Sequence, residues 1–134
     1  MAIDELYQQA VLELEGRGVM PDRPPGLEST REGLERIGFD QFPLAQHLRK
    51  DPTRVIVVAG TNGKGSTCAT LEALLMAEGE RTGLYTSPHL VDTTERFRVA
   101  GEDVSREIFV RAWQEVSQRT QGLKLSHFEM ITLM

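Results

Sequence analysis

The sequence predicts an α/β fold with a mostly parallel sheet and flanking helices, and three consecutive segments support that prediction. Residues 54–59, Arg-Val-Ile-Val-Val-Ala, are too few for a helix and too uniformly apolar for a half-exposed strand, which is typical of a buried parallel strand. A glycine-rich turn follows, and residues 66–78 then place leucines and alanines at helical spacing. Residues 82–86 are expected to form a second strand, which completes a βαβ unit.

The composition is that of an ordinary globular protein. The chain has 134 residues, of which 40% are hydrophobic and 26% charged, and this excludes collagen-like, low-complexity and broadly disordered chains. A single cysteine, Cys68, cannot form an internal disulfide, so a disulfide-stapled secreted scaffold is excluded. The chain has no long apolar run and no signal-peptide pattern, so we expect a cytoplasmic protein without a membrane partner. The net charge of -5 argues against a nucleic-acid partner.

Helical patterns precede the predicted βαβ unit. Residues 3–14 predict an amphipathic helix that ends at Gly16. Ser29, with Glu32 three residues later, fits a capping box that opens a short helix ending at Gly38. Residues 39–49 are expected to hold another helical turn or two.

Three further elements are expected after the unit. Residues 96–100 are expected to form a short exposed strand before a Gly101-Glu-Asp turn. Residues 105–122 predict a well-patterned helix, and residues 126–134 begin another apolar helix, with Ser126 as its N-cap. Since two or three strands do not make a robust parallel sheet, we expect the chain to be part of a larger protein.

The segment 59–66, Ala-Gly-Thr-Asn-Gly-Lys-Gly-Ser, is the strongest functional signal. Glycines let several backbone N–H groups approach a phosphate chain closely, and the N-terminus of the following helix attracts anions. Lys64 would reach the outer phosphates, and the hydroxyl of Ser66 or Thr67 would meet magnesium or a phosphate oxygen. The pattern G-x-x-x-x-G-K-[ST] is not met, because Val58 occupies the first glycine position and Gly65 follows the lysine. An ordinary strand-to-helix turn is the alternative, and the strand-turn-helix context favours nucleotide phosphate.

A second polar loop follows the second predicted strand. Residues 85–90, Tyr-Thr-Ser-Pro-His-Leu, are expected next to the phosphate loop, because ligands gather beyond the carboxyl ends of parallel strands. Ser87 offers a hydroxyl for a bound cation, although the residues alone favour an ordinary turn without a ligand. Residues 93–98 are interpreted as a solvated edge strand.

Four segments, taken in order, resemble one family. They are GLERIG at 33–38, VAGTNGKGST at 58–67, GLYTSPHLVDTTERFRVAGEDVS at 83–105 and SHFEMITL at 126–133. They resemble the N-terminal part of dihydrofolate synthase/folylpolyglutamate synthase, a member of the Mur ligase superfamily. The resemblance implies a truncated P-loop NTPase-like fold, that of the Mur ligase central domain. Residues 1–53 would then be a helical and loop segment before the sheet, and residues 54–134 the first part of the ATP-binding domain, with the remainder of that domain and the C-terminal domain absent.

The resemblance also implies an activity. Such enzymes are ATP-dependent ligases that phosphorylate a carboxylate of dihydropteroate or a folate, after which the amino group of L-glutamate attacks the acyl phosphate. ATP and Mg²⁺ are the implied cofactors, the partners are small-molecule substrates, and the parent enzyme is expected to be a monomer. We expect the 134 residues alone to bind nucleotide weakly and not to turn over.

The family's site residues can be carried onto matching positions. The resemblance assigns the ATP phosphates to Thr61, Asn62, Gly63, Lys64, Gly65 and Ser66, with Lys64 as the catalytic cation. It assigns a magnesium ligand to Ser87 and a pteroate-pocket lining to Ser126, His127, Phe128 and Glu129. Family members vary at Ser126 and His127, so Phe128 is the strongest of the pocket assignments.

Some alternatives stay open at the level of sequence. The motifs do not separate addition of the first glutamate from extension of the glutamate tail. Another Mur-type amide ligase, acting on a cell-wall or polymer substrate, is disfavoured by the segment 83–98. A nucleotide-binding module that has lost catalysis is the alternative outside enzymes.

Overall fold

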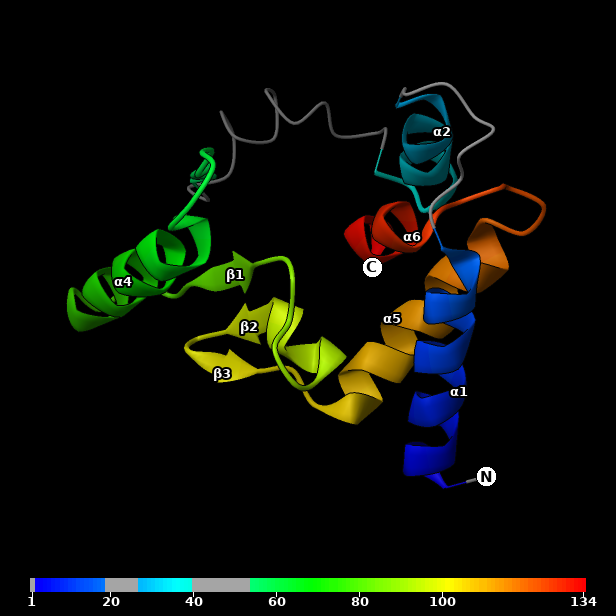
Figure 1. Ribbon diagram of the computed structural model, residues 1–134, viewed down its shortest axis with the longest axis horizontal. Helices are drawn as coiled ribbons and strands as arrows, with labels where there is room; N and C mark the ends of the chain where they lie inside the picture. Colours follow the sequence, from blue (N-terminus) through cyan, green and yellow to red (C-terminus); the bar gives the residue numbers. More distant parts are fainter. Residues whose placement is uncertain (1, 19–26, 40–53) are drawn as a thin grey trace. The chain divides into compact units, whose positions relative to one another are not determined.

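The computed structural model describes residues 2–18, 27–39 and 54–134, which divide into two compact units (Figure 1). We call residues 1–54 with 107–134 the helical unit and residues 55–106 the sheet unit. Most of the helical segment expected over 39–49 lies outside the described residues. The division into an N-terminal segment and an ATP-binding domain at residue 54 stays a prediction.

The helical unit is held together by one apolar core. Its helices are α1 (Ile3–Arg17), α2 (Glu28–Arg36), α5 (Arg106–Arg119, whose first residue belongs to the sheet unit) and α6 (His127–Leu133). The rings of Tyr7 on α1 and Phe109 on α5 meet edge to face, with centroids 5.2 Å apart. α6 packs against both α1 and α2 (Figure 1). The buried apolar side chains are Tyr7, Ala10, Leu14, Phe109, Val110, Trp113, Val116, Leu125, Met130, Ile131 and Leu133.

Some of the predicted helix ends are confirmed and others are not. α1 continues past Gly16 to Arg17, and Gly18 follows it with a φ of 55°. The capping box predicted for Ser29 and Glu32 is wrong, because α2 begins at Glu28 and Leu27 occupies the N-cap without a side-chain bond. Ser126 is confirmed as the N-cap of α6, because its hydroxyl accepts from the backbone N–H of Glu129 at 3.4 Å.

None of the helices in the described residues is both long and apolar enough to cross a membrane.

Gly33 sets the distance of closest approach between α2 and α6. A Cβ added to this buried glycine would lie 3.2 Å from Cδ2 of Leu133 and nearer still to its Cδ1. Leu133 is itself buried, so its side chain has little room to move away. Glycine is therefore required here for packing rather than for backbone conformation.

We predict that Gly33→Val lowers the free energy of unfolding of the helical unit by about 1–3 kcal/mol through overpacking. Urea denaturation followed by tryptophan fluorescence measures this, since Trp113 lies in the same core. Gly16→Ala is the matched control, because Gly16 lies in α1 and its added Cβ would meet nothing within 4 Å. That control is expected to be neutral or stabilising. Equal losses in both variants would contradict the packing argument.

The sheet unit combines one helix with a small antiparallel sheet. Its elements are α4 (Lys64–Ala77), β1 (Gly83–Tyr85), η1 (Thr93–Arg96), β2 (Phe97–Val99) and β3 (Glu102–Asp103), and the strand order is β1-β2-β3. Gly83 pairs with Val99 and Tyr85 with Phe97, while Arg98 pairs with Asp103. The strands predicted near 82–86 and 96–100 are thus confirmed in position, whereas Glu102–Asp103 pairs as a strand where a turn was expected.

The buried parallel strand predicted over 54–59 is not formed in this structure. The segment forms no strand, and Val55, Ile56 and Val57 are exposed by 52%, 57% and 84%. A strand needs a neighbour for its backbone N–H and C=O groups, and β1 pairs with β2 instead. The mostly parallel sheet is therefore not observed among the described residues, which contain an antiparallel one.

The buried side chains of the sheet unit are all polar. Within residues 55–106, all of which the structure describes, the buried residues are Glu72, Thr93, Thr94 and Arg96. The solvated edge strand expected over 93–98 is consequently wrong in its first part, since η1 begins there and three of its residues are buried. Directional polar contacts hold this unit together.

Candidate functional site

The glycine-rich turn forms the exposed N-terminus of α4. Gly63 is the N-cap and has a left-handed conformation, with a φ of 76°, which a residue with a side chain adopts only at a cost. No side chain caps this helix end, so the first-turn N–H groups, which lack intrahelical acceptors, remain available. A Cβ added at Gly63 or Gly65 would meet nothing within 4 Å, so the turn has open space around it. This arrangement suits an anionic ligand.

The Lys64 ammonium lies over the same turn. Its Nζ donates to the carbonyl oxygens of Gly60 at 2.8 Å and Thr61 at 3.2 Å. An ammonium has three N–H donors, so one remains for an incoming oxygen. The structure brings together all the residues predicted for the phosphates, which are Thr61, Asn62, Gly63, Lys64, Gly65 and Ser66, in one exposed segment. Their roles stay predictions.

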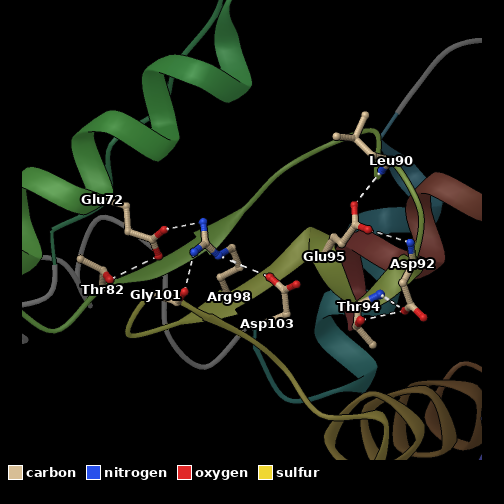
Figure 2. Close-up of polar contacts among 9 residues, drawn as sticks. All are labelled: Glu72, Thr82, Leu90, Asp92, Thr94, Glu95, Arg98, Gly101 and Asp103. Atoms are coloured by element: carbon tan, nitrogen blue, oxygen red, sulfur yellow. Dashed lines mark hydrogen bonds and ion pairs between the residues drawn. The ribbon is translucent and has the colours of Figure 1, made fainter.

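A buried carboxylate joins α4 to the sheet, and the sequence analysis missed it. Glu72 is 5% exposed, and its Oε2 lies 3.0 Å from Nη1 of Arg98 on β2 (Figure 2). Thr82 donates to Oε1 of Glu72 at 3.4 Å. Arg98 also donates to the carbonyl of Gly101, and its Nε lies 3.4 Å from Oδ1 of Asp103. The available signal was a charged residue that interrupts the apolar pattern of the helix.

We predict that Glu72→Ala lowers the stability of the sheet unit by about 1–3 kcal/mol, because it removes the buried acceptor of a charged guanidinium. Amide hydrogen exchange of β1 and β2 residues measures the loss. Asp103→Ala is the matched control, since Asp103 faces the same Arg98 but is 48% exposed. The control is expected to cost less than about 1 kcal/mol. A Glu72 effect no larger than the control's would rule out a central role for this contact.

The loop after β1 is anchored by the side chain of Arg96, at the end of η1. The N–H of Thr86 donates to the carbonyl of Arg96 at 3.0 Å, which continues the pairing of β1 with β2. The buried guanidinium then donates to Ser87 Oγ at 3.1 Å through Nη1 and to His89 Nδ1 at 2.9 Å through Nε. The interpretation of this stretch as a solvated edge overlooked Arg96.

Glu95 anchors the other half of the same loop (Figure 2). Its carboxylate accepts from the backbone N–H groups of Leu90 at 2.7 Å and Asp92 at 2.8 Å, both drawn in Figure 2. It also accepts from the N–H of Val91 at 3.0 Å. The hydrogen bonds from Leu90 and then Asp92 are the main cause that holds the pKa of Glu95 below its ordinary value. Asp92 in turn caps η1 by accepting from the N–H of Thr94 at 3.1 Å.

We predict that acid loosens this loop through Glu95. Because its folded pKa is lowered, its contribution is complete above the unfolded pKa of about 4.3 and is lost as pH falls through the folded value. Protection of the Leu90, Val91 and Asp92 amides, corrected for intrinsic exchange, is expected to fall as the pH drops below about 4.3. In Glu95→Gln the protection is already low and changes less with pH. An identical pH profile in the two proteins would exclude Glu95 as the cause.

The predicted metal ligand, Ser87, is exposed and lies in this loop. One lone pair of its oxygen accepts the Arg96 hydrogen bond, which leaves a second lone pair for a cation. No group of three or more His, Cys, Asp or Glu side chains within the described ranges is arranged to hold a metal ion. The magnesium role of Ser87 therefore stays a prediction.

The predicted pocket residues lie at the start of α6, in the helical unit. Ser126 caps the helix, and its hydroxyl contacts Oε2 of the buried Glu129 at 2.7 Å. Nδ1 of His127 lies 2.9 Å from the carbonyl oxygen of Leu14, so that nitrogen carries the proton. Phe128 is 54% exposed. Three of the four residues thus hold α6 in place, and Phe128 is the one whose ring is free for a ligand.

Comparisons with known proteins agree with the motifs. The chain is 43% identical over 101 residues to dihydrofolate synthase/folylpolyglutamate synthase of Escherichia coli, covering 75% of this chain and 24% of that protein. It is 59% identical over 106 residues to a folylpolyglutamate synthase of Arabidopsis thaliana, covering 78% of this chain and 18% of that protein. No protein-family model matches the chain.

Solved structures of similarly named proteins resemble this chain in fold. A bifunctional folylpolyglutamate synthase/dihydrofolate synthase of Yersinia pestis, complexed with AMPPNP and a Mn ion, matches 95% of this chain and 28% of its own with a TM-score of 0.79 at 35% identity. E. coli FolC in complex with DHPP and ADP matches 96% of this chain and 28% of its own with a TM-score of 0.75, also at 35% identity.

These matches identify the class as Mur-ligase-like α/β proteins. Within that class, sequence and structure both confirm the resemblance to the dihydrofolate synthase/folylpolyglutamate synthase family. The chain spans about a quarter of the length of the E. coli relative. The activity of these longer relatives can therefore only be proposed for this chain.

Proposed function

We propose that this chain contributes the phosphate-binding turn of an ATP-dependent ligase. The ligase forms an amide bond between L-glutamate and dihydropteroate or a folate. One observation supports this most directly: the uncapped N-terminus of α4, with Gly63 left-handed and Lys64 over the turn, in a chain that resembles glutamate ligases. The Yersinia and E. coli relatives whose structures hold AMPPNP or ADP lend further support.

The chemistry of the phosphate turn follows from its donors. The N–H groups of the turn bind the phosphate chain of ATP, and Lys64 stabilises the charge on the transferring phosphoryl group. The substrate carboxylate attacks the γ-phosphorus, and the bond to the ADP oxygen breaks. The glutamate amine then attacks the acyl carbon, loses a proton, and phosphate leaves with the electron pair of the broken C–O bond. Mg²⁺, when bound, neutralises phosphate charge, and Ser87 is the ligand we propose for it.

Phe128 is the proposed contact for the pteridine-bearing substrate. Its exposed ring can stack on a flat heteroaromatic group, while Ser126, His127 and Glu129 hold the start of α6 that carries it. A Mur-type ligase for a cell-wall or polymer substrate is the alternative enzyme, and the identity to folate synthases disfavours it.

We also propose that residues 54–59 form a parallel strand of a P-loop-type βαβ unit when further strands are present. The exposed valines and isoleucine of this segment would then be buried. A cytoplasmic location, a monomeric parent enzyme, and weak nucleotide binding without turnover by the 134 residues alone belong to the same proposal.

The test is ADP release by the full-length protein that carries this chain, with ATP, Mg²⁺, L-glutamate and dihydropteroate or tetrahydrofolate. We predict that Lys64→Ala lowers kcat about 10²–10³-fold, because the transferring phosphoryl group loses its cation. Lys124→Ala, on the loop before α6, is the control and should keep full activity. Release that does not depend on glutamate and a pterin substrate would refute the ligase.

The same assay separates the alternatives. A cell-wall or polymer ligase would accept another acid in place of the pterin substrate. A non-catalytic module would bind nucleotide, lose that binding in Lys64→Ala, and release no ADP with any substrate pair. Turnover by the 134 residues alone would contradict the expected inactivity of the isolated chain.

A further inference from the structure

Arg96 is a buried cation whose guanidinium donates two hydrogen bonds to the loop that follows β1. It is 7% exposed, and its guanidinium bonds Ser87 Oγ at 3.1 Å and His89 Nδ1 at 2.9 Å. Ser87 itself is exposed and His89 is half-buried. One desolvated side chain therefore holds two residues that lie nearer the surface.

The bond to His89 defines the protonation of its ring. Arginine stays charged and can only donate, so Nδ1 of His89 must accept. The neutral ring then carries its proton on Nε2, which presents an N–H donor away from Arg96. The hydrogen bond defines the tautomer and the ring orientation together.

The bond to Ser87 acts on the hydroxyl in a similar way. The oxygen accepts from Nη1, so one lone pair points to Arg96 and the other lone pair and the hydroxyl hydrogen point elsewhere. An exposed serine would otherwise rotate freely about χ1. The hydrogen bond thus selects one orientation before a ligand arrives.

The surroundings of Arg96 explain why the cation stays in place. Burial of a charge is costly unless it is hydrogen-bonded, and the two acceptors satisfy part of this need. Glu95, the residue before Arg96, binds the amides of residues 90–92 and so holds the other half of the same loop.

We propose that Arg96 is a positioning residue, which sets the Ser87 hydroxyl and the Nε2–H tautomer of His89 for ligand binding. The proposal deepens the ligase proposal above, because Ser87 is the magnesium ligand proposed there. Residues that orient a metal ligand without touching the metal commonly change metal affinity or rate by 10–100-fold. The sequence of residues 93–98 did not predict this role, because an arginine in a charged stretch is usually solvated.

The first test is nuclear magnetic resonance on the unliganded 134-residue chain, which needs no substrate. At about pH 8.5, where histidine is neutral, His89 should show one tautomer with an unprotonated Nδ1. A through-hydrogen-bond coupling between Arg96 Nε and His89 Nδ1, and slow exchange of the Arg96 Nε–H, should be detectable in the unmodified protein. Absence of both the coupling and the slow exchange would overturn the proposal.

The second test uses variants with a matched control. Arg96→Met should leave His89 as a mixture of tautomers and sharpen its signals through faster ring motion, and Arg96→Lys should restore the single tautomer only in part. Arg106→Met, which removes a nearby cation without a bond to Ser87 or His89, should leave His89 unchanged. An unchanged His89 in a folded Arg96→Met protein would contradict the proposal. Should that variant unfold, the measurement on the unmodified protein still decides.

The third test is kinetic and uses the full-length protein. We expect Arg96→Lys to raise the Mg²⁺ concentration for half-maximal rate about 10-fold, with the KM for the pterin substrate changed less than about twofold. If Arg96 only supported the fold, Arg96→Lys would impair kcat, the KM for the pterin substrate and the Mg²⁺ dependence to a similar extent. That result would overturn the positioning role. A protein without ligase activity would refute the proposed function, while the resonance results would still decide whether Arg96 orders the loop.

Discussion

The contact between Glu72 and Arg98 is the constraint on which the sheet unit depends. Glu72 is the buried acceptor on α4, and Arg98 carries the matching charge from β2, so this pair ties the helix to the sheet at 3.0 Å. The phosphate turn is the N-terminus of that helix, and the Ser87 loop leaves β1, which pairs with β2. The ion pair therefore links the helix that begins at the phosphate turn to the sheet from which the Ser87 loop leaves. Removal of Arg98 leaves the buried Glu72 without its charged partner, whereas removal of Glu72 leaves Arg98 with the more exposed Asp103.

Close packing between helices stabilises the helical unit, whereas an ion pair stabilises the sheet unit. Gly33 allows α2 to approach α6, and the capping contacts of Ser126 and Glu129 define where α6 begins. Thr30 on α2 also donates to Glu129 at 3.3 Å, so the same carboxylate serves the cap and the helix packing. The start of α6 is thereby fixed on several sides, and Phe128 is left exposed on a rigid support. Rigid support is what the stacking role proposed for Phe128 would require.

Local patterns in the sequence were sufficient for most elements. The apolar spacing of residues 105–122 and the capping pair of Ser126 and Glu129 specify α5 and α6, because both signals act within a few residues. The exposed turn with Lys64 was predictable for the same reason. The run at 54–59 was not, because an apolar pattern records a tendency to be buried and not the neighbour that buries it. The capping spacing of Ser29 and Glu32 also failed, because α2 begins one residue before that serine.

The side chains that hold the candidate site and that the sequence did not reveal are charged. Their hydrogen-bond and ion-pair partners are distant in the sequence or were not expected. Glu72 meets Arg98 across 26 positions of sequence, and no local pattern connects them. Arg96 lies in a stretch of charges that is typical of a solvated surface, and only the pairing of Thr86 with Arg96 brings its side chain to Ser87 and His89. The resemblance to a family pointed to the loop that contains Ser87 as a candidate site. The structure identified Arg96 and Glu95 as the residues that hold this loop.

The all-polar interior of residues 55–106 has a thermal consequence. Apolar burial is what gives unfolding its large positive heat capacity, and polar burial contributes with the opposite sign. A unit held by Glu72, Arg96 and two threonines therefore has a flatter dependence of stability on temperature than its helical companion, whose core is aromatic and aliphatic. The stability of the helical unit is therefore expected to curve more strongly with temperature than that of the sheet unit.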